Sequence, residues 1–97
     1  MNSAKFSALA ENDLEAIGDY IAQDNPSRAL SFMVELRNQC RKIALEPLGY
    51  RARPELAEGL RSCAYGNYVI FFKPRNTDVL IVRIMHGAQD IQAQFRE

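Results

Sequence analysis

The single histidine, His86, is the residue best suited to proton transfer, because histidine is the side-chain type that changes charge near neutral pH. It lies three residues after Arg83 and four before Asp90. RNA cleavage by general acid–base chemistry needs a positioned base and a cation for the phosphate, and Arg83 and Arg61 are candidate cations. The alternative is structural: the imidazole ends a strand by hydrogen bonding to nearby backbone or to Asp90. We favour the structural alternative.

The sequence does not contain the residue patterns that other kinds of catalysis require. One histidine and two cysteines 23 positions apart, Cys40 and Cys63, do not form a cluster with metal-ligand spacing. No glycine-rich loop precedes a helix, and no serine has the context of a nucleophile. Cys40 falls among apolar residues at helical spacing, which is typical of a small buried hydrophobe. We therefore expect no catalytic residue, metal or cofactor.

Composition indicates a globular chain that forms one domain over residues 1–97. Hydrophobic residues make up 47% and charged residues 25%, and the net charge is zero. The apolar runs are too short to cross a membrane, and the N-terminus does not have the pattern of a signal peptide, so we expect a cytoplasmic protein. Residues 51–97 carry seven Lys or Arg against five Asp or Glu, a weak basic excess that an ordinary mixed-charge surface also explains.

Two helices are predicted in the first half. Ser7 is a suitable N-cap for the first helix, whose apolar positions are Ala10, Leu14, Ile17 and Ile21. Asn25 and Pro26 form a helix start, and the apolar positions that follow are Ala29, Met33, Leu36, Cys40 and Ile43. Because so few residues separate the helices, we expect an antiparallel helix hairpin.

Strands dominate the second half. After a loop at 50–59, apolar runs at 60–65 and 68–73 flank Gly66-Asn67, a two-residue hairpin signal. A third run covers 79–85, residues 4–8 could add a brief edge strand, and residues 88–95 suggest a short terminal helix. The expected fold is α+β, a helix hairpin packed on a three- to four-stranded antiparallel sheet.

The last two strands are apolar on both faces. Simple alternation places Tyr68, Ile70 and Phe72 opposite Val69 and Phe71. In the next strand it places Leu80, Val82 and Ile84 opposite Val79, Ile81, Arg83 and Met85. The helix hairpin can cover one face only, so either another part of the chain or a second protein covers the other.

Several short sequence motifs, taken in order along nearly the whole chain, resemble those of a known protein family. The most specific motif is Ile81–Asp90, and the others are residues 10–17, 20–26, 60–62 and 66–72. With these motifs the chain resembles the ParE branch of the RelE/ParE superfamily, small bacterial toxins of type II toxin–antitoxin systems. The resemblance implies the same β-α-α-β-β-β order with a short C-terminal helix.

The resemblance also implies partners. A ParD-like antitoxin would hold the toxin silent in a hetero-oligomer, and DNA gyrase would be the target, trapped by binding without a chemical step. DNA would be contacted only through the antitoxin or gyrase, and no membrane is involved. We expect the partner-binding residues to be Arg61, Tyr68, Arg75, Arg83, His86, Asp90 and Phe95. The expected antitoxin groove consists of Leu14, Ile17, Ile21, Phe32, Leu36 and Phe71.

Two other functions remain open. A RelE-type toxin would cleave messenger RNA on the ribosome with His86, Arg61 and Arg83. Neutral charge, and the lack of a tyrosine or lysine after His86, favour ParE instead. The chain also departs from the commoner ParE form at Gln89, where an arginine often precedes the aspartate. The third possibility is an inactive module that only binds its antitoxin.

Overall fold

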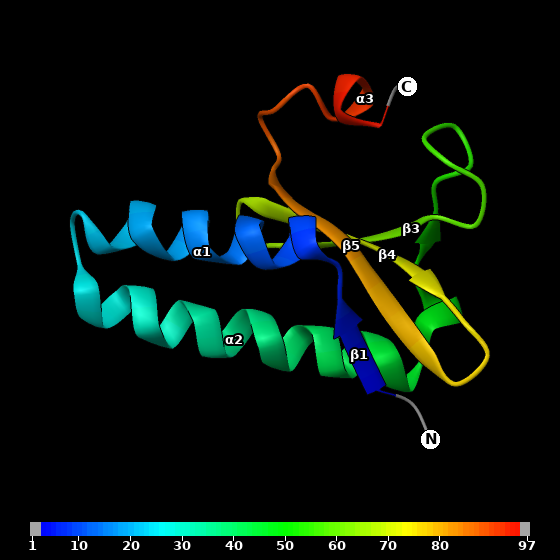
Figure 1. Cartoon of the computed structure of the whole chain (residues 1–97), viewed down its shortest axis with the longest axis horizontal. Helices are drawn as coiled ribbons and strands as arrows, with labels where there is room; N and C mark the ends of the chain where they lie inside the picture. The colour runs from blue at the N-terminus through cyan, green and yellow to red at the C-terminus, as the bar shows by residue number, and fades with distance from the viewer. Residues whose placement is uncertain (1–2, 96–97) are drawn as a thin grey trace.

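Two antiparallel helices pack on one face of a five-stranded sheet (Figure 1). The structure, a computed structural model, describes residues 3–95. The elements are β1 (Ser3–Phe6), α1 (Ala8–Ala22), α2 (Pro26–Leu45), the 3-10 turn η1 (Pro47–Gly49), β2 (Arg51–Ala52), β3 (Arg61–Tyr65), β4 (Tyr68–Pro74), β5 (Asp78–His86) and α3 (Ile91–Gln94). The α+β architecture is as predicted, and no helix within residues 3–95 is long and apolar enough to cross a membrane.

Both predicted helix starts are confirmed. The Ser7 hydroxyl accepts a hydrogen bond from the Ala10 amide at 3.0 Å, and it donates one to the Val82 carbonyl at 2.8 Å. The Asn25 side chain caps α2 by accepting from the Arg28 amide, with proline next at the first helical position. These caps satisfy amides that have no partner within the helix. Ser7 thereby also fixes the start of α1 against β5.

The sheet differs from the prediction in strand number and direction. Its order is β1-β5-β4-β3-β2, and β1 runs parallel to β5, so the sheet is mixed. The expectation of three to four antiparallel strands was therefore wrong. A parallel pair needs a long connection, and here all the elements between β1 and β5 supply it. The fifth strand, β2, lies inside the predicted loop 50–59, and its two residues are too few to show alternation.

A bulge also changes which β5 residues face the helices. Phe71 pairs with Arg83 but Phe72 pairs with Ile81, so Val82 is an extra residue on β5. The extra residue reverses the alternation from that point onward. The helix-side core contains Val79, Ile81 and Ile84, whereas Val82 and Met85 belong to the other face. The predicted grouping of Ile84 with Val82, and of Met85 with Ile81, was therefore wrong.

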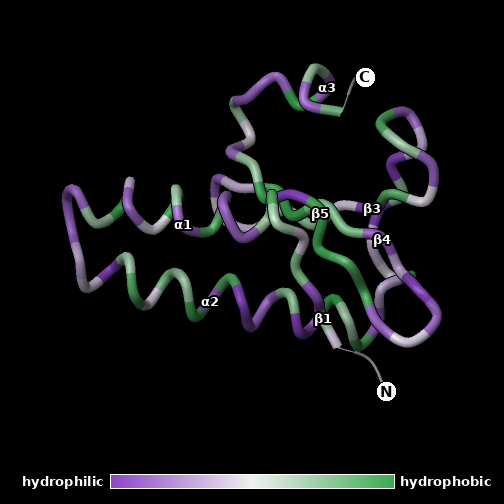
Figure 2. Tube along the Cα trace, viewed as in Figure 1, coloured by the Kyte–Doolittle hydropathy of each residue, from purple (hydrophilic) through white to green (hydrophobic). Residues whose placement is uncertain are grey.

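The chain itself covers the second face of the sheet. Leu60, Phe71 and Met85 form a second core, each at most 1% exposed. Leu56 and Ala57 from the 53–60 loop cover it, as do Ile91 and Phe95 from the C-terminal segment. Hydrophobic colour follows the central strands and alternates with hydrophilic colour along α1 and α2 (Figure 2). Of the two possibilities for this face, cover by the chain is the one observed.

Candidate partner-binding site

A row of three side chains crosses the end of the sheet nearest the β3–β4 turn. Tyr65 pairs with Tyr68 across that turn, and Tyr68 pairs with His86 at the end of β5. Gly66 supplies the turn with a φ of +57°, a left-handed value that glycine adopts readily, and so confirms the hairpin that the sequence predicted there. The Phe32 ring of α2 lies 5.9 Å from the Tyr65 ring and 5.7 Å from the Tyr68 ring. The helix hairpin thus supports an aromatic row with its outer edge exposed.

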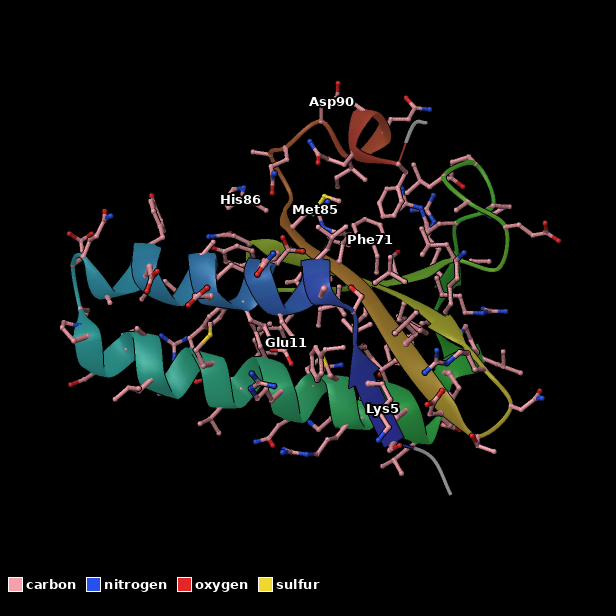
Figure 3. The ribbon with its side chains drawn as sticks, viewed as in Figure 1. Lys5, Glu11, Phe71, Met85, His86 and Asp90 are labelled. Carbon is pink, nitrogen blue, oxygen red and sulfur yellow. The ribbon has the colours of Figure 1, made fainter. Side chains whose placement is uncertain are left out.

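His86 makes the hydrogen bond to nearby backbone that the structural alternative predicted. Its Nδ1 accepts a hydrogen bond from the Ala88 amide at 3.0 Å, and its own amide donates to the Gln89 Oε1 at 2.7 Å. Asp90 caps α3 instead, by accepting from the Ala93 amide at 3.2 Å. The Ala88 amide therefore occupies the Nδ1 position of the ring, and the hydrogen bond fixes the ring relative to the following loop. Figure 3 shows His86 on the α1 side of the end of β5, with Asp90 in the loop that follows.

Arg83 binds a carboxylate of the chain itself. Its Nε and Nη2 donate to the two Asp13 oxygens at 2.8 and 2.9 Å, and the Ile84 amide donates to the same carboxylate at 2.8 Å. Hydrogen bonding to Asp13 raises the pKa of Arg83 above its ordinary value. The guanidinium also reaches the Gln94 side chain at 3.5 Å. The pair therefore joins α1, β5 and α3.

Arg61 and Arg75 lie away from this end of the sheet. Arg61 precedes Tyr65 by four residues on β3, which places it about 13 Å along the strand. Its guanidinium donates to the Tyr50 carbonyl at 2.6 Å. Arg75 forms a bidentate pair with Asp78 in the β4–β5 turn, about 26 Å along β5 from His86.

The residues proposed for RNA cleavage are therefore not assembled. The guanidinium of Arg83 is held by Asp13, and Arg61 is distant from His86. Chemistry on a phosphodiester needs a base and a cation within hydrogen-bond reach of one substrate.

The residues predicted to form an antitoxin groove lie mostly in the interior. Leu14, Ile17, Phe32, Leu36 and Phe71 are at most 7% exposed, and Ile21 is partly buried. Phe95, from the partner-binding set, lies with its ring 5.0 Å from that of Phe71. Figure 3 shows Phe71 and Met85 between the sheet and the C-terminal segment. Most of these side chains stabilise the fold as core residues, and only Leu14 and Ile17 also line surface depressions.

An open groove does lie between the outer faces of α1 and α2. It has a volume of about 420 Å³, and Leu14 and Ala29 lie at its base with the exposed Leu30 beside them. Small residues in both helices, including Gly18, leave this space. A partner that entered this groove would contact Leu14.

Two residues of this region escaped sequence analysis. Asp13 is 70 positions from Arg83, and no local pattern indicates that they meet. Tyr20 is 69% exposed on α1 and lines a pocket with Tyr68 and His86. A large aromatic side chain four residues after Ala16 on a polar helix face was the available signal for Tyr20.

The match to a family model decides the family. A model of the ParE toxin of the type II toxin–antitoxin system parDE matches residues 4–91. The chain belongs to the ParE toxin family. No protein of curated function gives a significant match.

Solved structures agree with this assignment. A chain of the chromosomal ParDE toxin–antitoxin system of P. aeruginosa is 25% identical with a TM-score of 0.73, over 89% of this chain and 96% of that one. A chain of the RelBE2 toxin–antitoxin complex of Mycobacterium tuberculosis is 28% identical with a TM-score of 0.61, over 87% and 95%. The relatives of this ParE family member thus come from both branches of the superfamily.

Neither thiol is placed for chemistry. Burial raises the pKa of Cys40 to about 12, and burial also raises the pKa of Cys63. A raised pKa lowers the thiolate fraction, to about one in ten thousand for Cys40 at pH 8, and only the thiolate is nucleophilic. Within residues 3–95, no group of three metal-ligating side chains is present either.

We expect both thiols of the folded chain to react slowly with Ellman's reagent at pH 8. In guanidinium chloride both should react within seconds to minutes, because unfolding restores the ordinary pKa of cysteine. The measurement is the absorbance of released thionitrobenzoate under the two conditions. Rapid release of two equivalents from the folded chain would show that the core around Cys40 is open.

Proposed function

We propose that this ParE family member is the toxin of a type II toxin–antitoxin pair that inhibits DNA gyrase by binding and blocks replication. A ParD-like antitoxin holds it silent. The observation that supports binding over catalysis is the ion pair between Arg83 and Asp13. Arg83 lies three residues before His86 in the sequence, and its guanidinium is already bound by a carboxylate of the chain itself. A binding toxin needs no free cation to stabilise a phosphate, whereas an RNA-cleaving toxin does.

The end of β5 is the proposed contact with gyrase. His86 and the following loop are exposed, and the backbone there is fixed by the hydrogen bonds of His86 with Ala88 and Gln89. A rigid exposed end with an aromatic row suits a protein interface, because aromatic side chains are frequent among the residues that dominate binding energy. Arg61 and Arg75 belong to other parts of the sheet and would serve a second contact.

The test is a cleavage assay with purified gyrase, plasmid DNA and ATP. We expect the isolated chain to trap cleaved complexes, which appear as linear DNA after denaturation with detergent and protease. Preincubation with the antitoxin should abolish the product. The absence of linear DNA, together with cleavage of ribosome-bound messenger RNA, would overturn the proposal in favour of the RelE-type function.

Two variants locate the contact. His86→Ala is expected to lower the yield of linear DNA by about fivefold or more, the loss typical of a central interface residue. Leu48→Ala, in η1, is the control, since this exposed side chain lies outside the aromatic row. An equal loss from Leu48→Ala, or none from His86→Ala, would place the contact elsewhere.

A further inference from the structure

The pocket beside His86 has the size of a single side chain. It is lined by Ala16, Ile17, Tyr20, Tyr68 and His86, and its volume is about 250 Å³. Pockets for drug-sized ligands run from about 300 to 1,000 Å³, so this one is below that range. Its walls come from α1 and from the ends of β4 and β5, which are separate in sequence.

Aromatic rings form its walls. The Tyr68 and His86 rings lie 5.3 Å apart at an interplanar angle of 81°, so they meet as a corner. Tyr20 supplies a third ring from α1, and its proximity contributes, after burial, to the raised pKa of Tyr68. Aromatic faces carry negative potential and attract cations, most strongly when several rings surround them.

The charges near the pocket include few that are not already paired. The helix α1 carries four carboxylates and no lysine or arginine, but Glu11 pairs with Arg37 and Asp13 with Arg83, which leaves Glu15 and Asp19. The segment 84–95, on the other side, contains Asp90 and no lysine or arginine. The guanidinium of Arg83 is already neutralised by Asp13. Within residues 3–95, a phosphate or a carboxylate in this pocket would meet no unpaired arginine or lysine among the lining residues, whereas a cationic group would meet aromatic rings.

We propose that this pocket binds an arginine or lysine side chain of the antitoxin by cation–π contact. The choice of the antitoxin rests on the proposed function, because a protein that silences the toxin must cover the end of β5 offered to gyrase. The methylene stem of such a side chain would pack on Ile17 and Ala16, while its charged head would lie among the three rings. Filling the pocket would therefore place antitoxin backbone directly over His86.

The first experiment measures the cation preference of the isolated chain. Choline and 3,3-dimethyl-1-butanol have the same shape and differ in charge, and each is titrated while the ring signals of Tyr20, Tyr68 and His86 are followed by NMR. We expect choline to bind about two- to fivefold more tightly, the range for a cation–π contact at an accessible site. Equal binding of the two probes, or tighter binding of adenosine monophosphate, would overturn the proposal.

Matched variants assign the effect to the pocket. Tyr20→Leu keeps apolar bulk but removes a ring, so it should abolish the preference for choline over the alcohol. Tyr20→Phe keeps the ring and should retain the preference. Because Tyr20 is 69% exposed, neither change should unfold the chain. An unchanged preference in Tyr20→Leu would show that choline binds elsewhere.

The second experiment uses the toxin–antitoxin complex. If an antitoxin side chain fills the pocket, choline should no longer shift these ring signals. Binding of choline to the complex as tightly as to the free chain would overturn the antitoxin as occupant. Neither readout depends on gyrase. A negative cleavage assay together with a positive choline result would therefore overturn gyrase as the target and still support the pocket as a cation-binding site.

Discussion

Asp13→Ala is expected to lower the free energy of unfolding by about 3 kcal/mol. The change removes three hydrogen bonds and leaves the Arg83 guanidinium, whose side chain is only 18% exposed, without its counter-charge. Breaking a buried ion pair from one side costs about 3–5 kcal/mol, and partial exposure places this pair at the low end. For a chain of this length the loss corresponds to a decrease in Tm of more than about 10 °C.

Urea unfolding followed by circular dichroism measures this effect, since the chain has no tryptophan for fluorescence. Glu11→Ala is the control on the same helix: its pair with Arg37 joins side chains that are 53% and 45% exposed, and such pairs contribute at most about 1 kcal/mol. Asp13→Asn keeps an acceptor for the Ile84 amide and should cost less than Asp13→Ala. If Asp13→Ala costs no more than Glu11→Ala, the pair does not join α1 to β5 in solution.

Phe71→Ala is expected to destabilise the chain by about 3–5 kcal/mol, as much as Phe72→Ala. Both side chains are fully buried but in different cores, Phe72 beneath the helices and Phe71 beneath the C-terminal segment. Truncation of a buried phenylalanine costs this much because it combines lost transfer free energy with a cavity.

Equilibrium unfolding of the two variants tests whether the second face is a true core. Leu48→Ala, at a side chain that is 72% exposed, should stay within about 0.5 kcal/mol of the parent. A cost for Phe71→Ala well below that for Phe72→Ala would mean that α3 and the 53–60 loop do not cover the sheet in solution. The second face would then be open to a partner.

If both predictions hold, contacts on both faces of the sheet hold the end of β5 in place. Asp13 fixes Arg83 from α1, and the second core holds Met85 beneath Ile91 and Phe95. His86 follows directly, so its position depends on both. A partner would then meet a preformed surface, which lowers the entropy cost of binding.

The sequence by itself determined the local elements. Helical spacing, the caps at Ser7 and Asn25, and the glycine at position 66 are properties of neighbouring residues, and the structure confirms each. The family could also be predicted from the sequence, because the family's motifs occur in order along the chain, and the family model matches residues 4–91. A hydrogen bond between His86 and nearby backbone was one of the two arrangements predicted from its place at a strand end, and the Ala88 amide makes it, whereas Asp90 caps α3.

Only the tertiary structure decided what depends on distant residues. The parallel pairing of β1 with β5 and the ion pair of Asp13 with Arg83 join positions that are 70 or more residues apart. The extra residue at Val82 changes the register of β5 against β4 by one residue. The same holds for the burial of Phe71 by Phe95, which turned a predicted groove residue into core. Local pattern carries no information about such contacts, because the free energy that selects them comes from packing and pairing across the whole fold.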